Sequence, residues 1–513
     1  MGIILVKTKR EDNFSDWYQE VIQEAELADH SPVRGCMIVR PCGMGIWERM
    51  KQDLDARFRH LGHRNAYFPL FIPLSFFEKE AEHVEGFATE CAVVTHHRIA
   101  ADENGAFVPA GPLEEPLVVR PTSETMVGEA FSRWISSYRD LPLLINQWSN
   151  VVRWEMRTRM FLRTTEILWQ EGHTAHATAE EADQHARTML DTYTSFLKER
   201  VAIPVVAGEK TEHERFPGAV ATYTMEALMQ DGKALQVGTS HMLGTHFSKA
   251  SKITFQTKEG KEEYVHTTSW GVTTRMVGAM IMMHGDDEGC IVPPGIAPDQ
   301  VVILPLVHRA EDRDLIEQAC HALAQDIAEL QYQGEAVRVH VDRVAERRAR
   351  GDQFWGWVKK GIPIRIEVGK RELDAGLLSV GRRDLPTSQR EQMSKEELLH
   401  SLPLQLQEMH NVLYERALKR HQPQYLSSKE DLLSHFRQEG ASWVLAYVRC
   451  TPEIERSLQE ELGVTVRCIP WNVIPRNANF DHGQIEECAC ACASACIWTG
   501  EKGGALVLVG KGY

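Results

Sequence analysis

The sequence predicts an α/β chain of three units: an α+β unit built on an antiparallel sheet, an α/β domain, and a small α/β unit at the end. Three observations carry this prediction. The chain has 513 residues, which is too long for one hydrophobic core. Residues 150–173 show the pattern of strand, loop and strand, and beyond the proline-rich stretch 291–298 strands and helices alternate. We therefore expect units at residues 1–297, 298–405 and 406–513.

Composition narrows the class of protein. The hydrophobic content of 43% and the charged content of 25% are ordinary for a globular protein. The net charge of −15 argues against nucleic acid bound over the whole surface, although a local basic face is compatible with it. The longest apolar run, residues 276–283, is far shorter than the ~20 residues of a membrane span. Eleven cysteines at uneven spacing favour a reducing compartment, so we expect a cytoplasmic protein without a membrane partner.

The first elements are read from apolar spacing. Residues 14–25 and 46–61 carry apolar side chains three and four positions apart, which predicts two amphipathic helices, the second ended by Gly62. A short strand is expected at 33–41, with Gly43 and Gly45 in the turn that follows. Residues 65–71 read as an aromatic strand that contains Pro69.

Residues 150–173 place fixed charges beside one another. Arg153 and Glu155 alternate, so we expect them on one face of a strand, with Arg163 on the returning strand. Arginine is always charged and forms bidentate contacts with phosphate, which suits an anionic reacting centre. A surface hairpin with ion pairs is the alternative.

Three further stretches carry polar residues at strand ends. A strand ends at Pro121, and Thr122 or Ser123 can cap a helix that begins near Glu124. A strand at 234–241 alternates polar side chains, although a histidine such as His241 can equally be a satisfied core residue. A strand at 266–271 leads to an apolar helix at 276–283 with Arg275 at its N-terminal end. A charge in such a place needs a partner, either a carboxylate or a bound phosphate.

Taken together, these motifs resemble those of class II aminoacyl-tRNA synthetases. The helix and proline-containing strand at 46–71 resemble motif 1, residues 150–173 motif 2, and residues 266–287 motif 3. The string RPTSET at 120–125 is similar to prolyl-tRNA synthetases of the archaeal and eukaryotic type, whose C-terminal extension follows the anticodon domain. The resemblance implies a homodimeric ligase that activates L-proline with ATP to prolyl-adenylate and transfers it to tRNA(Pro).

The resemblance also implies roles for residues. Arg153, Glu155 and Arg275 would be catalytic. ATP, with Mg²⁺, would be bound by Arg153, Glu155, Arg163, Thr164, Gln236, Thr239, Thr273 and Arg275. Proline would be bound by Thr122, Glu124, Arg153, Trp169, Glu171, His173, Phe216, His241, Ser269 and Gly271.

The second and third units carry further expectations. The string KGIPIRIEVGKR at 360–371 resembles the anticodon-binding domain, so Lys360, Glu367, Lys370 and Arg371 would contact tRNA. The alternative to tRNA contacts is that these charges simply alternate along an exposed edge strand.

The third unit holds most of the cysteines. By resemblance, a structural zinc site would use Cys450, Cys468, Cys488 and Cys492, and a degenerate site with free thiols is the alternative. The strand pattern at 505–509 runs to Tyr513, whose side chain and carboxylate would reach back to the active site.

Two other functions stay open. A threonyl-tRNA synthetase would need zinc ligands in its pocket, and these motifs contain none. A catalytically silent paralogue is disfavoured because Arg153, Glu155, Arg163 and Arg275 occur together.

Overall fold

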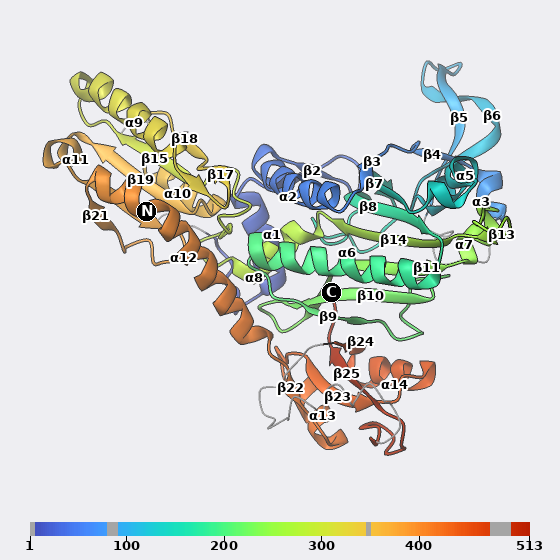
Figure 1. The fold of residues 1–513 in the computed structure, drawn as a ribbon. Helices are drawn as coiled ribbons and strands as arrows, with labels where there is room; N and C mark the ends of the chain where they lie inside the picture. The colour runs from blue at the N-terminus through green and yellow to red at the C-terminus, as the bar shows by residue number, and fades with distance from the viewer. Residues whose placement is uncertain (1–5, 80–90, 345–349, 472–493) are drawn as a thin grey trace.

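The computed structural model describes residues 6–79, 91–344, 350–471 and 494–513 of the chain (Figure 1). Its centre is an eleven-stranded sheet that runs from the first unit into the third. In order across the sheet, the strands are β22 (Gln424–Tyr425), β23 (Val444–Val448), β25 (Ala505–Gly510), β24 (Thr465–Pro470), β9 (Val206–Glu209), β10 (Ala221–Leu228), β11 (Ala234–Gly244), β14 (His266–Thr273), β8 (Glu166–His176), β7 (Leu143–Val152) and β3 (Arg64–Asn65). The pairs β7–β8, β8–β14, β14–β11 and β11–β10 are antiparallel, which confirms the predicted class of sheet.

Helix α6 (Ala179–Arg200) covers one face of the central strands (Figure 1). The Thr178 hydroxyl accepts from the Glu181 backbone N–H and so caps the helix. The helix buries an apolar stripe that includes Leu190, Tyr193 and Leu197. It shares one hydrophobic core with α1 (Phe14–Glu24), α2 (Pro41–His60) and α8 (Arg275–His284). The opposite face of strands β8, β14, β11 and β10 is thereby left for a cavity.

Two local expectations in the first unit are wrong. Helix α2 begins at Pro41, so Gly43 and Gly45 lie inside it rather than in a turn. A Cβ on Gly43 would lie 2.3 Å from the Leu27 carbonyl oxygen, so glycine there permits close packing. The strand expected at 65–71 is not continuous, since β3 ends at Asn65 and the next strand begins at Phe71.

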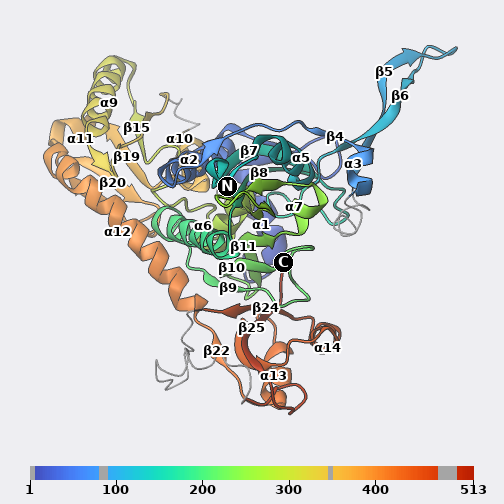
Figure 2. The same ribbon diagram turned by 45° about the vertical axis from the view of Figure 1, so that its right-hand side comes forward.

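Smaller elements surround this core. Strands β4 (Phe71–Pro73), β6 (Phe107–Val119) and β5 (Ala92–Ala101) form a three-stranded sheet, and the β5–β6 hairpin projects as an arm (Figure 2). The remaining elements of the first unit are β1 (Ala28–His30), β2 (Met37–Val39), α3 (Leu74–Lys79), α5 (Glu124–Trp134), η2 (Tyr138–Asp140), α7 (His246–Ala250), β12 (Thr254–Gln256) and β13 (Glu262–Tyr264).

The second unit is a five-stranded α/β sheet, as predicted. Its strand order is β18 (Val339–Val341), β15 (Val301–Leu306), β19 (Ile364–Gly369), β20 (Leu378–Arg382) and β21 (Glu391–Met393). Helices α9 (Arg313–Ala328), α10 (Arg350–Lys360) and α11 (Lys370–Ala375), the turn η3 (Ala310–Asp312) and the short strands β16 (Gln331–Tyr332) and β17 (Glu335–Ala336) complete it. Because β19 is central, the alternative of an exposed edge strand does not apply.

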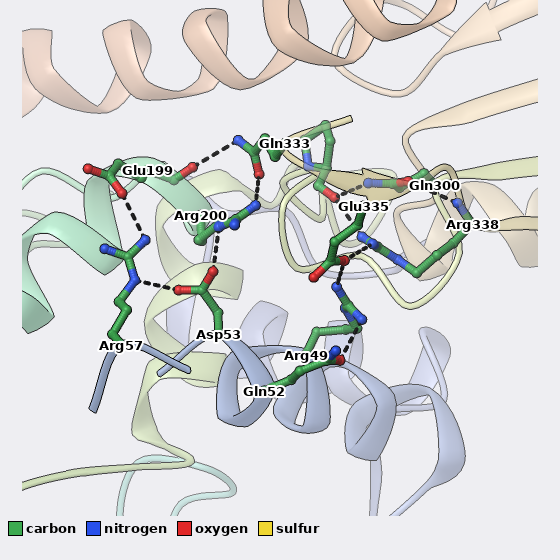
Figure 3. A network of polar contacts seen from close by, with 11 residues as sticks. Arg49, Gln52, Asp53, Arg57, Glu199, Arg200, Gln300, Gln333, Glu335 and Arg338 are labelled. Carbon is green, nitrogen blue, oxygen red and sulfur yellow. Dashed lines mark hydrogen bonds and ion pairs between the residues drawn. The ribbon is translucent and has the colours of Figure 1, made fainter. Parts of the chain in front are cut away.

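A polar network holds the second unit against the first (Figure 3). The Asp53 carboxylate of α2 accepts from Arg57 Nε and Arg200 Nε, each at 2.6 Å. Arg200 also donates to Gln333 in the β16–β17 turn. Arg49 and Arg338 both contact Glu335, so each unit contributes charge to the contact.

Helix α12 (Lys395–His421) crosses the predicted boundary at 405/406 without a break and leads to α13 (Lys429–Phe436) and α14 (Pro452–Leu462). The third unit is not separate either, since β24 pairs with β9 at Ile469–Glu209 and Pro470–Gly208. In the described ranges, no helix is long and apolar enough to cross a bilayer.

Candidate active site

A cavity of about 350 Å³ lies on the face of the central sheet that α6 leaves open. Among the residues expected to bind ATP and proline, all but Glu155 and Arg163 line it. These lining residues are Thr122, Glu124, Arg153, Thr164, Trp169, Glu171, His173, Phe216, Gln236, Thr239, His241, Ser269, Gly271, Thr273 and Arg275.

Strand register explains why these residues meet. Glu171 of β8 lies opposite Gly271 of β14, which lies opposite Thr239 of β11. Two residues along each strand, His173, Ser269 and His241 form the next row. Side chains two positions apart share a face, so the alternating pattern in three separate strands builds one wall.

Glu171 and His173 form a buried ion pair at the base of the cavity. Glu171 Oε2 lies 3.0 Å from His173 Nε2, and Glu171 Oε1 accepts from Ser123 Oγ at 2.6 Å and Gln147 Nε2 at 2.7 Å. Burial raises the pKa of Glu171, but hydrogen bonds from His173, Ser123 and Gln147 outweigh burial and hold this pKa below its usual value. Burial lowers the pKa of His173, but the hydrogen bond and negative charge of Glu171 outweigh burial and raise this pKa above its usual value, so both shifts favour the charged forms of the pair.

His241 is the neutral member of the same row. Burial, followed by repulsion from His173, lowers its pKa to about 3. Its ring nitrogens lie 3.1 Å from Thr222 Oγ1 and 3.0 Å from Thr239 Oγ1, and its ring packs against Phe216 at 4.6 Å. The wall therefore offers an uncharged imidazole and an aromatic face beside the charged pair.

The RPTSET stretch forms the entrance to α5. Ser123 occupies the N-cap position but makes no capping bond, because its hydroxyl donates to Glu171. The Thr122 hydroxyl donates to the Glu124 carboxylate, and both residues line the cavity. A second carboxylate thus faces the same space as Glu171.

Arg153 lies just past β7 rather than within it. Its Nε donates to the Pro121 carbonyl at 2.8 Å, and its guanidinium lies 5.7 Å from the Trp169 ring centroid. The expectation that Arg153 and Glu155 alternate along a strand is wrong, since β7 ends at Val152. The carbonyl and the aromatic ring fix the guanidinium at the cavity wall instead.

Arg275 is the first residue of α8, as the sequence indicated. Its Nε and Nη1 donate to the Leu162 and Gln236 carbonyls, each at 3.2 Å. Burial lowers its pKa to about 10, and the positive charges of Arg163 and Arg153 add to this effect. Such mutual repulsion marks a place where a bound anion would be favourable.

Arg163 and Glu155 lie outside the lining of the cavity. Arg163 precedes β8 in a loop, with Nη1 3.8 Å from Glu155 Oε2. Its Nη2 donates to the Tyr513 backbone oxygen at 3.1 Å. The Tyr513 hydroxyl donates to Asp231 at 2.7 Å, so Tyr513 is held beside the loop between β10 and β11.

Comparison with known proteins identifies the family. Residues 110–284 match the model described as "tRNA synthetase class II core domain (G, H, P, S and T)", and residues 300–403 match "Anticodon binding domain". Proline–tRNA ligase 2 of Anaeromyxobacter dehalogenans is 52% identical over 91% of this chain and 93% of its own length. Proline–tRNA ligase of Bdellovibrio bacteriovorus is 47% identical over 100% of both chains. This chain belongs to the proline–tRNA ligase family.

One cluster of charged side chains beside the cavity of this proline–tRNA ligase family member was not predicted from the sequence. Lys210 lines the cavity and donates from Nζ to Glu226 Oε1 at 3.0 Å. Arg467 of the third unit donates to Glu226 Oε2 from Nε at 3.0 Å and Nη2 at 2.7 Å. Strand β10 carries polar side chains at every second position, namely Thr222, Thr224 and Glu226. This alternation could have indicated Glu226. No pattern in the sequence around Arg467 indicates that it lies beside Glu226.

The expected anticodon residues separate into two places. Glu367 lies at the carboxyl end of central strand β19, where Arg390 Nη1 donates to it at 2.9 Å. Lys370 and Arg371 begin the adjoining helix α11. Lys360 instead pairs with Glu26 of the first unit at 2.7 Å, so the structure does not bring it to the same edge.

The cysteines expected to bind zinc also lie in separate places. Cys450 packs against the core of α13 and α14, whereas Cys468 belongs to a different cluster with Val206 and Leu508. The two thiols therefore do not share a site, and Cys488 and Cys492 lie outside the described residues. Within the part of the chain that the structure describes, no group of three or more His, Cys, Asp or Glu side chains could hold a metal.

Proposed function

We propose that this chain joins L-proline to ATP as prolyl-adenylate and transfers the prolyl group to tRNA(Pro). The observation that carries the proposal is the cavity itself, which sets arginine guanidinium groups near a compact wall of aromatic and carboxylate side chains. Such a cavity suits a small amino acid held against a phosphorylated nucleotide.

Adenylate formation requires two anions to meet. A proline carboxylate oxygen attacks the α-phosphorus of ATP, an O–P bond forms, and pyrophosphate leaves with the electrons of the broken P–O bond. Arg153, fixed by Pro121 and Trp169, would contact the carboxylate and the α-phosphate. Arg275 would hold the distal phosphates at the N-terminus of α8, and Arg163 would assist from the loop.

The opposite wall would select proline. His173 balances the charge of Glu171, which leaves Glu124 to receive the cationic secondary amine. Trp169 and Phe216 would pack against the ring, with the neutral His241 beside them. Backbone at Gly271 allows close approach, because no side chain occupies that point of the wall.

Class II synthetases use Mg²⁺ with ATP, and the residues present fit that ion. The Glu155 carboxylate is one-quarter exposed beside Arg163, so it is accessible to a hydrated cation, and Gln236 lines the cavity. When bound, Mg²⁺ would neutralise phosphate charge. A zinc site does not fit the described cysteines.

The function is tested by ATP–pyrophosphate exchange measured separately with all twenty amino acids. Proline should support exchange far above the others. Exchange with threonine alone, or with no amino acid, would contradict the proposal.

The second unit would read tRNA. We expect Glu367→Gln and Arg371→Gln to lower aminoacylation about tenfold each, because each removes one charged contact of roughly 1–3 kcal/mol from an RNA surface. ATP–pyrophosphate exchange should stay near wild type, since these side chains are remote from the cavity. Lys261→Gln, on the exposed β12–β13 hairpin, is the control for charge loss, and equal loss in both assays would place the tRNA surface elsewhere.

The contact at Tyr513 predicts a remote effect on activation. Deleting residues 511–513 removes the oxygen that accepts from Arg163 and the backbone bonds to Ala234. Michaelis constants for proline and ATP in the exchange reaction should rise several-fold while the fold is retained. Unchanged constants would leave Tyr513 a packing role.

We also propose a homodimer formed through α2 and β3. β3 is the last strand of the large sheet, and Tyr67 beside it is 74% exposed. Tyr67→Glu is expected to halve the mass measured by light scattering, because a buried charge without a partner disfavours association. Leu404→Glu, a substitution of a residue on α12 that is 68% exposed, should leave the mass unchanged.

A cytoplasmic location is part of the proposal. All cysteines within the described ranges are free thiols, which fits a reducing compartment.

A further inference from the structure

A second cavity, of about 380 Å³, lies where the first unit meets the second unit and α12. The last turn of α8 supplies Met283 and His284, and the segment after β20 supplies Asp384. Arg10 enters from the N-terminal segment, and Arg416 and Arg420 enter from α12. Three arginines from two distant parts of the chain therefore face one space.

Most of the carboxylates around this cavity already form ion pairs with arginines. Arg383 donates to both oxygens of Asp286, from Nη1 at 2.7 Å and from Nη2 at 2.5 Å. Arg382 donates to both oxygens of Asp384, whose side chain is fully buried. Glu288 also lines the cavity and accepts from the Thr387 hydroxyl at 3.2 Å. Two of the three lining carboxylates are thus neutralised by arginines that are not part of the lining.

Arg416 and Arg420, by contrast, contact backbone carbonyls. Arg416 Nη2 donates to the Asp384 carbonyl at 2.9 Å, and Arg420 Nη2 donates to the Met283 carbonyl at 2.7 Å. In the described ranges, neither guanidinium has a carboxylate within ion-pair distance, and the buried Arg420 Nε has no hydrogen-bond partner. Carbonyl contacts orient these groups without neutralising them.

The lining arginines repel one another in this cavity, where Glu288 is the one lining carboxylate without an arginine partner in the described ranges. Burial lowers the pKa of Arg420, and the positive charges of Arg10 and Arg416 lower it further. His284 adds no charge, because burial lowers its pKa to about 3. Arg10 is partly satisfied by Asp287 at 3.1 Å, which leaves Arg416 and Arg420 as the principal cations.

We propose that this inter-domain cavity binds a small phosphate oxyanion of the inorganic pyrophosphate class between Arg416 and Arg420, with Arg10 at its margin. Guanidinium groups form bidentate contacts with phosphate oxygens, and the carbonyl contacts hold both groups ready for such an anion. The site is separate from the active site, because the ten-residue α8 places about 15 Å between Arg275 and the last turn. A bound anion would tie α12 to the end of α8.

The test is calorimetric titration of inorganic pyrophosphate into the full chain, at fixed ionic strength and without magnesium. Wild type is expected to show two classes of site per chain, since the active-site arginines also attract pyrophosphate. Arg275→Ala should weaken one class and leave the other. Adding Arg416→Gln to Arg275→Ala should weaken binding at the remaining class of site about tenfold, the effect of losing one bidentate guanidinium contact with phosphate.

Two further variants keep this test decisive. Arg313→Gln, an exposed arginine on α9 paired with Glu317, is the control for net charge and should leave both classes unchanged. Arg420→Lys retains the charge but not the fork, so it should weaken the same class while the unfolding temperature without pyrophosphate stays constant. Equal affinity with and without Arg416→Gln would overturn the proposal. A loss confined to tRNA binding, with pyrophosphate binding unchanged, would overturn it as well.

Discussion

Replacing Arg153 with alanine is expected to lower proline-dependent ATP–pyrophosphate exchange by at least about a hundredfold. The guanidinium is fixed by the Pro121 carbonyl and the Trp169 ring at the point where two anions must approach each other. Its loss removes stabilisation that strengthens as the carboxylate attacks the α-phosphate, so the rate constant should fall more than the Michaelis constants rise. Exchange kinetics at saturating proline and ATP measure this.

The matched control is Arg157→Ala in the same loop, where the side chain is exposed. It should leave exchange within a few-fold of wild type. Arg153→Lys should fall between the two, because lysine supplies charge without the planar fork. Near-normal exchange by the alanine variant, with the fold intact, would remove Arg153 from the reacting centre.

Replacing Glu226 with alanine is expected to lower the free energy of unfolding by about 3–5 kcal/mol. Glu226 is fully buried and accepts from Lys210, Thr224 and Arg467. Alanine would leave two buried cations without their carboxylate. The midpoint of denaturant unfolding measures the change, and exchange activity should fall with it because Lys210 lines the active-site cavity.

An exposed ion pair in the third unit provides the comparison. Arg449→Ala breaks the contact with Glu501, whose side chain is 61% exposed, and should cost less than about 1 kcal/mol. Glu226→Gln keeps the volume and part of the hydrogen bonding, so it should lie between these values. Similar small losses for Glu226→Ala and Arg449→Ala would mean that the buried network adds little.

The sequence predicted best what local pattern determines. Apolar spacing predicted α1 and most of α2, and the order of charged and apolar residues placed Arg275 at the start of α8. Alternating polar side chains were predicted from the sequence for the strand at 234–241, which became β11. The resemblance then supplied roles that spacing alone does not assign.

What the sequence could not show depends on contacts between distant segments. Gly43 reads as a turn residue, because the approach of the Leu27 carbonyl is invisible in its neighbourhood. Lys360 resembles an RNA contact, yet its partner is Glu26 in another unit. The place of Arg467 beside Glu226 depends on the pairing of β24 with β9, which no local pattern encodes.

The junction of β9 and β24 constrains how the molecule is made. The ribosome delivers β9 early and β24 near the end, so a nascent chain carries an unpaired strand edge while α9 to α12 emerge. Until residues 465–470 dock, the carboxylate of Glu226 lacks Arg467 and the sheet beside the cavity is incomplete. A chain stalled in translation before β24 would therefore lack Arg467 beside Glu226 and expose the edge of β9, so we expect it to be inactive and prone to aggregation.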